Sequence, residues 1–280
     1  MLLVFLLLIL PFFSTLTGLI FYRFQGKKDI FKIDIVQFYY TFIVWPIIFV
    51  WAKTMIFWIL QANTHLVSTK EIYTIDTAYS VVFMVIYAFI AMHSLTKTFH
   101  LKEKDPLYNF FIDSEYIHLW LSHIAMVLGG GIIATTIAFI NLWFPIEWLA
   151  SSSVVIWLMI LFFIMGFFIY LIIELTDPKQ EKRFTYMRIV KLMFGFILTL
   201  HIIFFAIKTP DISSQYVVFW SSFMMFFGAS ILGFTTYRSA RFKQWLNGLV
   251  KKKMIYKNKG WGENIALFNH RDFEKKRQSN

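Results

Sequence analysis

The chain has 280 residues, of which 58% are hydrophobic, 20% are aromatic and only 15% are charged, with a formal net charge of +11. Soluble domains carry about a quarter charged residues, so this composition excludes an ordinary soluble fold and predicts an integral membrane protein whose apolar surface faces lipid. Cysteine is absent, which excludes disulfides, thiolate metal sites and cysteine nucleophiles.

Seven apolar segments are long enough to cross a bilayer, which takes about 20 residues of helix. The predicted spans are 1–22, 35–60, 75–96, 116–144, 151–175, 188–208 and 215–237. Because no basic residue precedes the first apolar run, we interpret that run as a retained helix and not as a cleaved signal peptide. The sequence therefore predicts an all-α, polytopic membrane domain of seven helices over 1–237.

Two residues distinguish the second span. The Trp45-Pro46 step removes a backbone donor and predicts a kink. Lys53 lies inside the apolar run, where we expect its side chain to snorkel toward the outer surface. In the third span, polar side chains share one face, with His93 just outside it: Asp76, Tyr79, Ser80, Tyr87, Ser94 and Lys97.

The fourth span carries three consecutive glycines and most of the polar groups found inside the membrane. On a helical wheel, one arc of about 140° holds nearly all of its small and polar residues. These are His118, Ser122, His123, Gly129, Gly130, Thr136 and Asn141. Because polar and small residues face protein in a bundle, the third, fourth and seventh spans are predicted to be the inner helices. The seventh qualifies through its small-residue seam, which includes Ala229 and Gly233.

The basic residues are divided unequally between the two ends of the spans. Of the 27 lysines and arginines, 24 fall in segments 23–34, 97–115, 176–191 and 238–280, and the other three are Lys53, Lys70 and Lys208. The positive-inside rule then predicts an outer N-terminus and an inner C-terminus. We expect a bacterial inner membrane, a plasma membrane or the inner membrane of an organelle.

The tail, 238–280, is predicted to begin with a basic amphipathic helix over about 239–255. An apolar stripe that includes Trp245 and Leu249 faces a basic side, which is typical of a helix lying in the membrane interface. The expected contacts with anionic lipid or with partner subunits are Arg241, Lys243, Trp245, Lys251, Lys252 and Lys253. Nucleic-acid binding is disfavoured, because the apolar stripe already accounts for the aromatic residues.

The histidines inside the spans are the candidate ligands for a cofactor. His93 and His123 differ in depth by only about 5 Å if their spans are helical, so a b-type haem is permitted but not required. Glu115-x-x-His118 matches half of a di-iron site but lacks the second half. His118 and His123 lie about 140° apart on the wheel and cannot chelate one ion, so no metal site is predicted.

No hydrolase or metalloprotease motif is present, and the outer loops are too short for a catalytic domain. The leading hypothesis is a non-catalytic integral subunit of a larger membrane assembly of the energy-transducing or secretion type. The alternative is a small-solute or ion transporter that uses the third, fourth and seventh spans. Its candidate residues are Lys53, His201 and the seven residues of the fourth-span arc, with the glycine triplet 129–131 as a candidate unwound segment near the midplane. A haem- or quinone-binding redox subunit is the second alternative.

Overall fold

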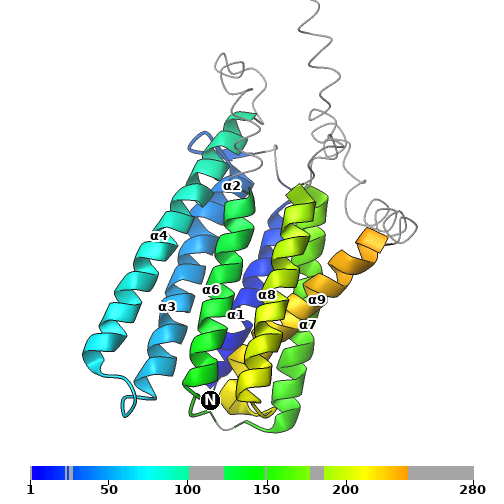
Figure 1. Cartoon of the computed structure of the whole chain (residues 1–280). Helices are drawn as coiled ribbons and strands as arrows, with labels where there is room; N and C mark the ends of the chain where they lie inside the picture. Colours follow the sequence, from blue (N-terminus) through cyan, green and yellow to red (C-terminus); the bar gives the residue numbers. More distant parts are fainter. Residues whose placement is uncertain are drawn as a thin grey trace, which may run out of the picture.

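The computed structural model describes residues 2–22, 24, 28–100, 123–148, 150–176 and 186–238. These residues form a helical bundle with one small hairpin (Figure 1). The α-helices are α1 (Leu2–Tyr22), α2 (Ile35–Tyr39), α3 (Trp45–Gln61), α4 (Thr69–His100), α6 (His123–Trp143), α7 (Ser152–Thr176), α8 (Tyr186–Lys208) and α9 (Val217–Arg238). The other elements are strands β1 (Asp29–Ile30) and β2 (Ile33–Asp34), the π-helix η1 (Tyr40–Val44) and the 3₁₀-helix η3 (Ser214–Tyr216).

Six of the predicted spans are confirmed as helices long and apolar enough to cross a membrane. Their limits are Ile35–Gln61, Thr69–Leu95, Ile124–Trp143, Ser152–Leu171, Ile189–Lys208 and Ser214–Thr235. The third begins about two turns earlier than expected, because Ser68 and Glu71 form a reciprocal cap: the Glu71 carboxylate accepts from the Ser68 amide, 2.8 Å away, and the Ser68 hydroxyl accepts from the Glu71 amide. The first predicted span is a helix, α1, but it is not among these six.

The second span is continuous and contains a π-helical turn where a kink was expected. The amide of Trp45 donates to the carbonyl of Tyr40, five residues back, directly before Pro46. A proline cannot donate to the carbonyl four residues earlier and its ring crowds that carbonyl. Widening the preceding turn accommodates both effects, so α2, η1 and α3 continue as one span.

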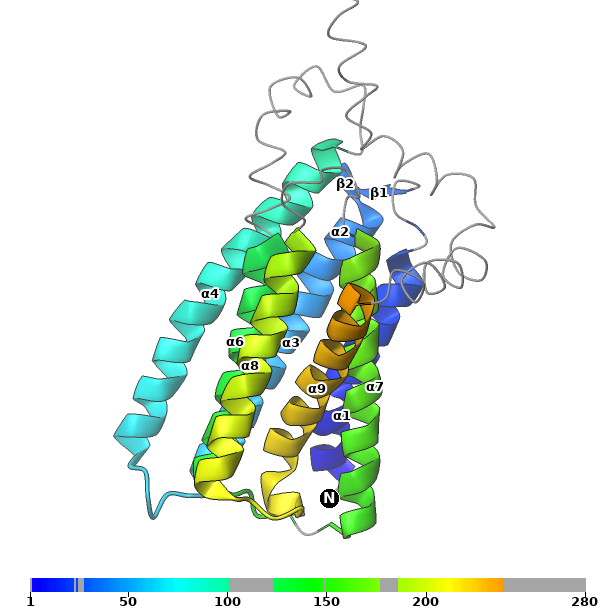
Figure 2. The same cartoon turned by 45° about the vertical axis from the view of Figure 1, so that its right-hand side comes forward.

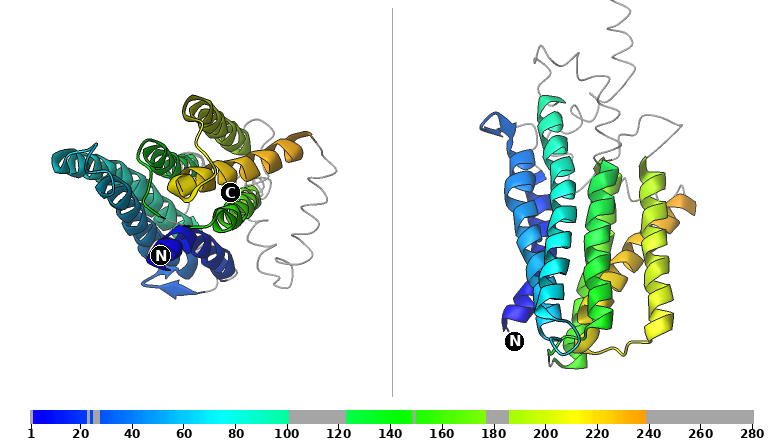
Figure 3. Two further views of the ribbon diagram at one scale, coloured as in Figure 1. Left: turned by 90° about the horizontal axis from the view of Figure 1, so that it is seen from below. Right: turned by 60° about the vertical axis from the view of Figure 1, so that its left-hand side comes forward.

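α6 lies at the centre of the bundle and contacts α3, α4, α8 and α9. α9 is the most buried span, since 61% of its most apolar stretch is buried, against 22% for that of α4. The expectation of inner helices is therefore correct for α6 and α9. It is wrong for α4, which lies at one edge of the bundle (Figure 3) and has little of its most apolar stretch buried.

The closest helix contact in the described bundle joins α7 to α9. A Cβ built on Gly166 would lie 2.0 Å from the carbonyl oxygen of Met225, and one on Gly228 would lie 2.5 Å from that of Phe163. The two helices touch backbone to backbone, which only glycine allows. Ala229, from the expected small-residue seam, packs beside this contact. The role of Gly166 was not predicted.

The hairpin β1–β2 precedes α2 at the end of the bundle opposite the N-terminus (Figure 2). Its two turn residues, Phe31 and Lys32, have φ angles of 50° and 63°. Non-glycine residues in this region carry a cost of roughly 1–2 kcal/mol each. The carboxylate of Asp34 ends the hairpin by accepting hydrogen bonds from the amides of Val36 and Gln37, which caps α2.

Candidate functional site

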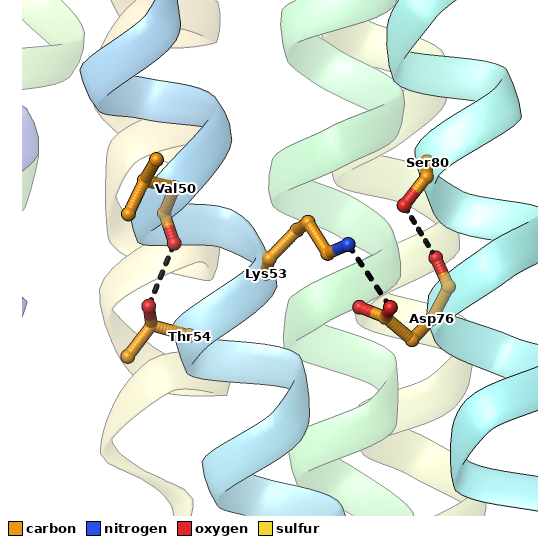
Figure 4. A network of polar contacts seen from close by, with 5 residues as sticks. All are labelled: Val50, Lys53, Thr54, Asp76 and Ser80. Atoms are coloured by element: carbon orange, nitrogen blue, oxygen red, sulfur yellow. Dashed lines mark hydrogen bonds and ion pairs between the residues drawn. The ribbon is translucent and has the colours of Figure 1, made fainter.

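An ion pair joins the two helices at the edge of the bundle. The ammonium of Lys53 on α3 lies 3.0 Å from the carboxylate of Asp76 on α4, as Figure 4 shows. The same ammonium lies 5.5 Å from the ring centroid of Phe49, one turn earlier on α3, which adds a cation–π contact. Lys53 therefore pairs across the helix interface instead of extending to the outer surface as predicted.

The pair lies about two turns inside both helices. Lys53 precedes the end of α3 by eight residues and Asp76 follows the start of α4 by seven. At 1.5 Å per residue these positions are about 12 and 10 Å from the helix ends. The two helices run antiparallel in Figure 1, so the two charges meet at matched depth.

Asp76 interrupts the stripe of α4 that packs against its neighbours. The buried residues of that stripe are Ile72, Tyr79, Phe83, Ile86 and Ile90. Their spacing alternates between three and four residues once Asp76 is included, as on the contact side of a packed helix. The sequence thus places a carboxylate where an apolar residue would otherwise contact α3, and Lys53 neutralises it there.

The neighbouring hydroxyl groups of Ser80 and Thr54 donate to backbone carbonyls and not to the carboxylate of Asp76. Ser80 donates to the backbone carbonyl of Asp76 at 2.8 Å, and Thr54 donates to that of Val50 at 2.7 Å (Figure 4). The hydroxyl of Tyr79, three residues after Asp76, is buried and has no hydrogen-bond partner among the described residues. Burying an unpaired hydroxyl is costly, and the same holds for the buried, unpaired groups of Thr135, Trp148, Ser221 and Ser230.

The pair remains partly accessible. The side chain of Lys53 is 33% exposed and that of Asp76 is 23% exposed. Charges within the hydrocarbon region normally face protein or water. The pair thus differs from the purely apolar contacts between α3 and α4. In one of these the rings of Phe49 and Phe83 pack with their centroids 4.3 Å apart.

Two of the three consecutive glycines of α6 are used in packing. A Cβ on Gly129 would lie 2.6 Å from the side chain of Ile86 on α4, and one on Gly131 would lie 2.7 Å from Ile197 on α8. No described atom lies within 4 Å of a Cβ on Gly130. The triplet is helical, so the unwound segment considered for transport is absent at these residues, and α6 packs closely on both sides.

Asn141 has its hydrogen-bonding groups engaged at the start of α9. Its side-chain oxygen accepts from the amides of Val218 and Phe219, both at 3.1 Å, and its amide nitrogen donates to the carbonyl of Gln215 at 2.8 Å and, more weakly, of Phe144 at 3.5 Å. The side chain is fully buried. It therefore caps α9 from another helix, and this cap fixes α6 against α9.

His201 on α8 is also fully buried. Its Nδ1 donates to the carbonyl of Ile197 at 2.9 Å, and its Nε2 lies 3.1 Å from the hydroxyl of Ser222 on α9. With Nδ1 protonated, a neutral ring accepts at Nε2 from Ser222. The ring packs among four phenylalanine rings, those of Phe139, Phe219, Phe223 and Phe226. This arrangement holds a neutral imidazole between α6, α8 and α9.

The remaining predicted residues are not brought together by the described part of the chain. His93 is buried on α4, and Thr136 is half-buried on α6. The side chain of His123 lies outside the described residues, so the haem hypothesis stays a prediction. The other predicted positions outside the description are His118, Ser122, the helix at 239–255 and the tail residues Arg241, Lys243, Trp245, Lys251, Lys252 and Lys253.

Within the described ranges, no cluster of three or more histidine, aspartate or glutamate side chains could hold a metal ion. The six apolar helices make this chain an all-α, multi-pass membrane protein. Comparison of the chain with family models, curated proteins and solved structures finds no match.

Asp76 is the site residue that sequence reasoning missed, although it was placed on the polar face of the third span. The predicted spans concealed the pairing, because Lys53 lies seven residues inside the predicted end of the second span at 60, whereas Asp76 lies one residue inside the predicted start of the third at 75. Only the earlier start of α4, at Thr69, places the two charges at matched depth. Opposite charges at matched depth on neighbouring helices are expected to pair, because neither is stable alone in hydrocarbon.

Proposed function

We propose that this protein is a non-catalytic integral subunit of a larger membrane assembly and that the edge formed by α3 and α4 is its docking surface. The observation that carries the proposal is the partly exposed Lys53–Asp76 pair on the bundle's edge. A pair packed against a partner's polar group loses less solvation energy than one facing lipid.

The proposed topology has seven spans, with α1 as the first, an outer N-terminus and an inner C-terminus. α1 is a 21-residue apolar helix that contacts α3 and α7 along the bundle. α1, α4, α7 and α9 all end at the same end of the bundle, opposite the N-terminus (Figure 1). Each is followed in sequence by one of the basic segments, which the positive-inside rule assigns to the inner side.

Cysteine cross-linking tests the docking surface, because the natural chain offers no background thiol. Tyr73→Cys places a thiol on α4 one turn from Asp76, at a position that is 60% exposed. Leu192→Cys, on an exposed position of α8, is the matched control. In native membranes we expect a protein adduct with a bifunctional reagent from position 73 and none from 192. A chain that purifies alone in mild detergent and forms no adduct at position 73 would contradict the proposal.

Transport of a small solute or ion is the second candidate, and the partial exposure of the Lys53–Asp76 pair within two spans favours it. A charge pair that water can reach inside a span could line a hydrated path. The discriminating variant is Thr54→Cys, adjacent to Lys53 and exposed on α3. Reaction of this thiol with a membrane-impermeant reagent would favour a water-filled path and transport. Protection of this thiol from the reagent in native membranes, lost when the partner subunit is removed, would favour the assembly.

A further inference from the structure

The turn of the β1–β2 hairpin has a sequence that opposes its own geometry. Strand residues Ile30 and Ile33 pair directly, so the loop consists of Phe31 and Lys32 alone. Both have positive φ angles. A two-residue turn with two positive φ values strongly favours Asn-Gly. A bulky aromatic and a lysine at these positions indicate that the side chains serve a purpose other than forming the turn.

Phe31 extends an aromatic row that begins on the surface of the second span. Its side chain is 86% exposed. Its ring lies 6.3 Å from that of Phe38 on α2, and Phe38 lies 5.0 Å from Phe42 on η1. Phe42 is itself exposed on the side of the span. The row therefore continues the lipid-facing surface of the helix up to the tip of the hairpin.

The hairpin stands at the boundary of the apolar span, because Ile35 is the first residue of that span. The amide of Ile35 donates to the carbonyl of Lys28 at 2.9 Å, which ties the base of the hairpin to α2. Lys28, Asp29 and Lys32 are exposed, whereas Asp34 is buried as the cap of α2. Two cations, one anion and one exposed aromatic ring thus lie at the boundary of the apolar span, with an excess of one positive charge among the exposed groups.

We propose that the hairpin over 28–34 is a binding site for anionic lipid, in which Lys28 and Lys32 contact the headgroup phosphates and Phe31 inserts at the start of the acyl chains. Aromatic rings and lysines are favoured at this depth. A lipid occupant fits better than a protein partner, because the aromatic row is continuous with a lipid-facing helix surface. That the hairpin contacts the inner leaflet follows from the topology proposed above. The binding of lipid does not depend on that topology.

Spin labelling of Phe31→Cys in the full-length, otherwise cysteine-free chain tests the insertion. In nanodiscs containing phosphatidylglycerol, we expect the label to be accessible to oxygen and protected from a water-soluble nickel chelate. Thr64→Cys, exposed in the connector after α3 at the other end of the bundle, is the control and should show the reverse. A label at position 31 that is fully accessible to the nickel chelate would overturn the proposal.

A pair of double variants tests lipid binding separately from folding. Phe31→Asn with Lys32→Gly suits the turn better than the natural residues, so the fold should be retained while lipid binding is lost. Lys28→Gln with Lys32→Gln leaves the aromatic ring in place and should weaken phosphatidylglycerol binding about fivefold for each lysine removed. Native mass spectrometry of bound lipid measures both, with Lys70→Gln, at the opposite end of the bundle, as control. Unchanged phosphatidylglycerol binding in both double variants would overturn the proposal whether or not a protein partner exists.

Discussion

The carboxylate of Asp76 lies 3.0 Å from the ammonium of Lys53, and this contact joins α4 to α3 about two turns from the connected ends of the two helices. Farther along the same interface, toward the bundle end opposite the N-terminus, Thr41 of η1 hydrogen-bonds to Ser94 of α4. Between these two polar contacts the rings of Phe49 and Phe83 pack together. The edge helix is therefore held by polar contacts near both ends and by aromatic packing in the middle.

Removing one partner of the ion pair should destabilise the protein more than removing both. Asp76→Asn leaves Lys53 without a counter-charge, and we expect a loss of about 2 kcal/mol, less than for a fully buried pair because both groups are partly exposed. Lys53→Met combined with Asp76→Leu should recover most of that loss. Thermal unfolding in detergent measures both. If the double variant loses as much stability as Lys53→Met and Asp76→Leu lose when their separate effects are added, this account is contradicted.

The cap that Asn141 supplies to α9 predicts a graded series of variants. Asn141→Leu leaves the amides of Val218 and Phe219 without their acceptor, and we expect a loss of about 2–3 kcal/mol because buried polar groups become unpaired. Asn141→Asp keeps the acceptor and loses the donor to Gln215, so its stability should lie between those of the leucine variant and the natural protein. The midpoint of thermal unfolding ranks the three. Equal stability of the leucine variant and the natural protein would exclude the cap as a stabilising contact.

The contact between α7 and α9 should not tolerate a methyl group. Gly166→Ala places a Cβ against the backbone carbonyl of Met225, so the helices must separate, at an expected loss of about 1–3 kcal/mol. Gly130→Ala is the matched control, because its Cβ meets no described atom within 4 Å. Alanine there should be neutral or stabilising, since it favours the helix. Similar unfolding temperatures for both variants would disprove the close contact.

His201 should contribute through its hydrogen bonds and through its ring packing, and two substitutions separate these contributions. His201→Phe keeps an aromatic ring among the surrounding phenylalanines but removes both hydrogen bonds, for an expected loss of about 1–2 kcal/mol. His201→Ala also leaves a cavity, and the loss should rise to about 3–4 kcal/mol. Ser222→Ala, which removes one bond only, is the control. If the phenylalanine and alanine variants unfold at the same temperature, ring packing is not what holds this site.

The positions of the spans could be read from the sequence because each depends on local composition. Long apolar runs between polar segments must become helices in a membrane, where every backbone group has to be paired within its own segment. The π-turn was foreseen only in part. Pro46 indicated a disturbance of the helix, but a widened turn and a bend in the helix accommodate a proline equally well. The central position of α6 followed from its glycines and polar residues, which face protein on more than one side.

The contacts between helices were decided by the tertiary structure. Lys53 could have reached the outer surface, and only the position of α4 brought Asp76 within 3.0 Å. Asn141 was interpreted as a residue facing a transport path, and only the approach of α9 placed two free amides against its side chain. A helix fixes the direction of each side chain relative to its own axis, whereas rotation and neighbour depend on packing over the whole bundle. The sequence by itself therefore determined a helical membrane protein and its spans, and the tertiary structure decided which polar groups meet.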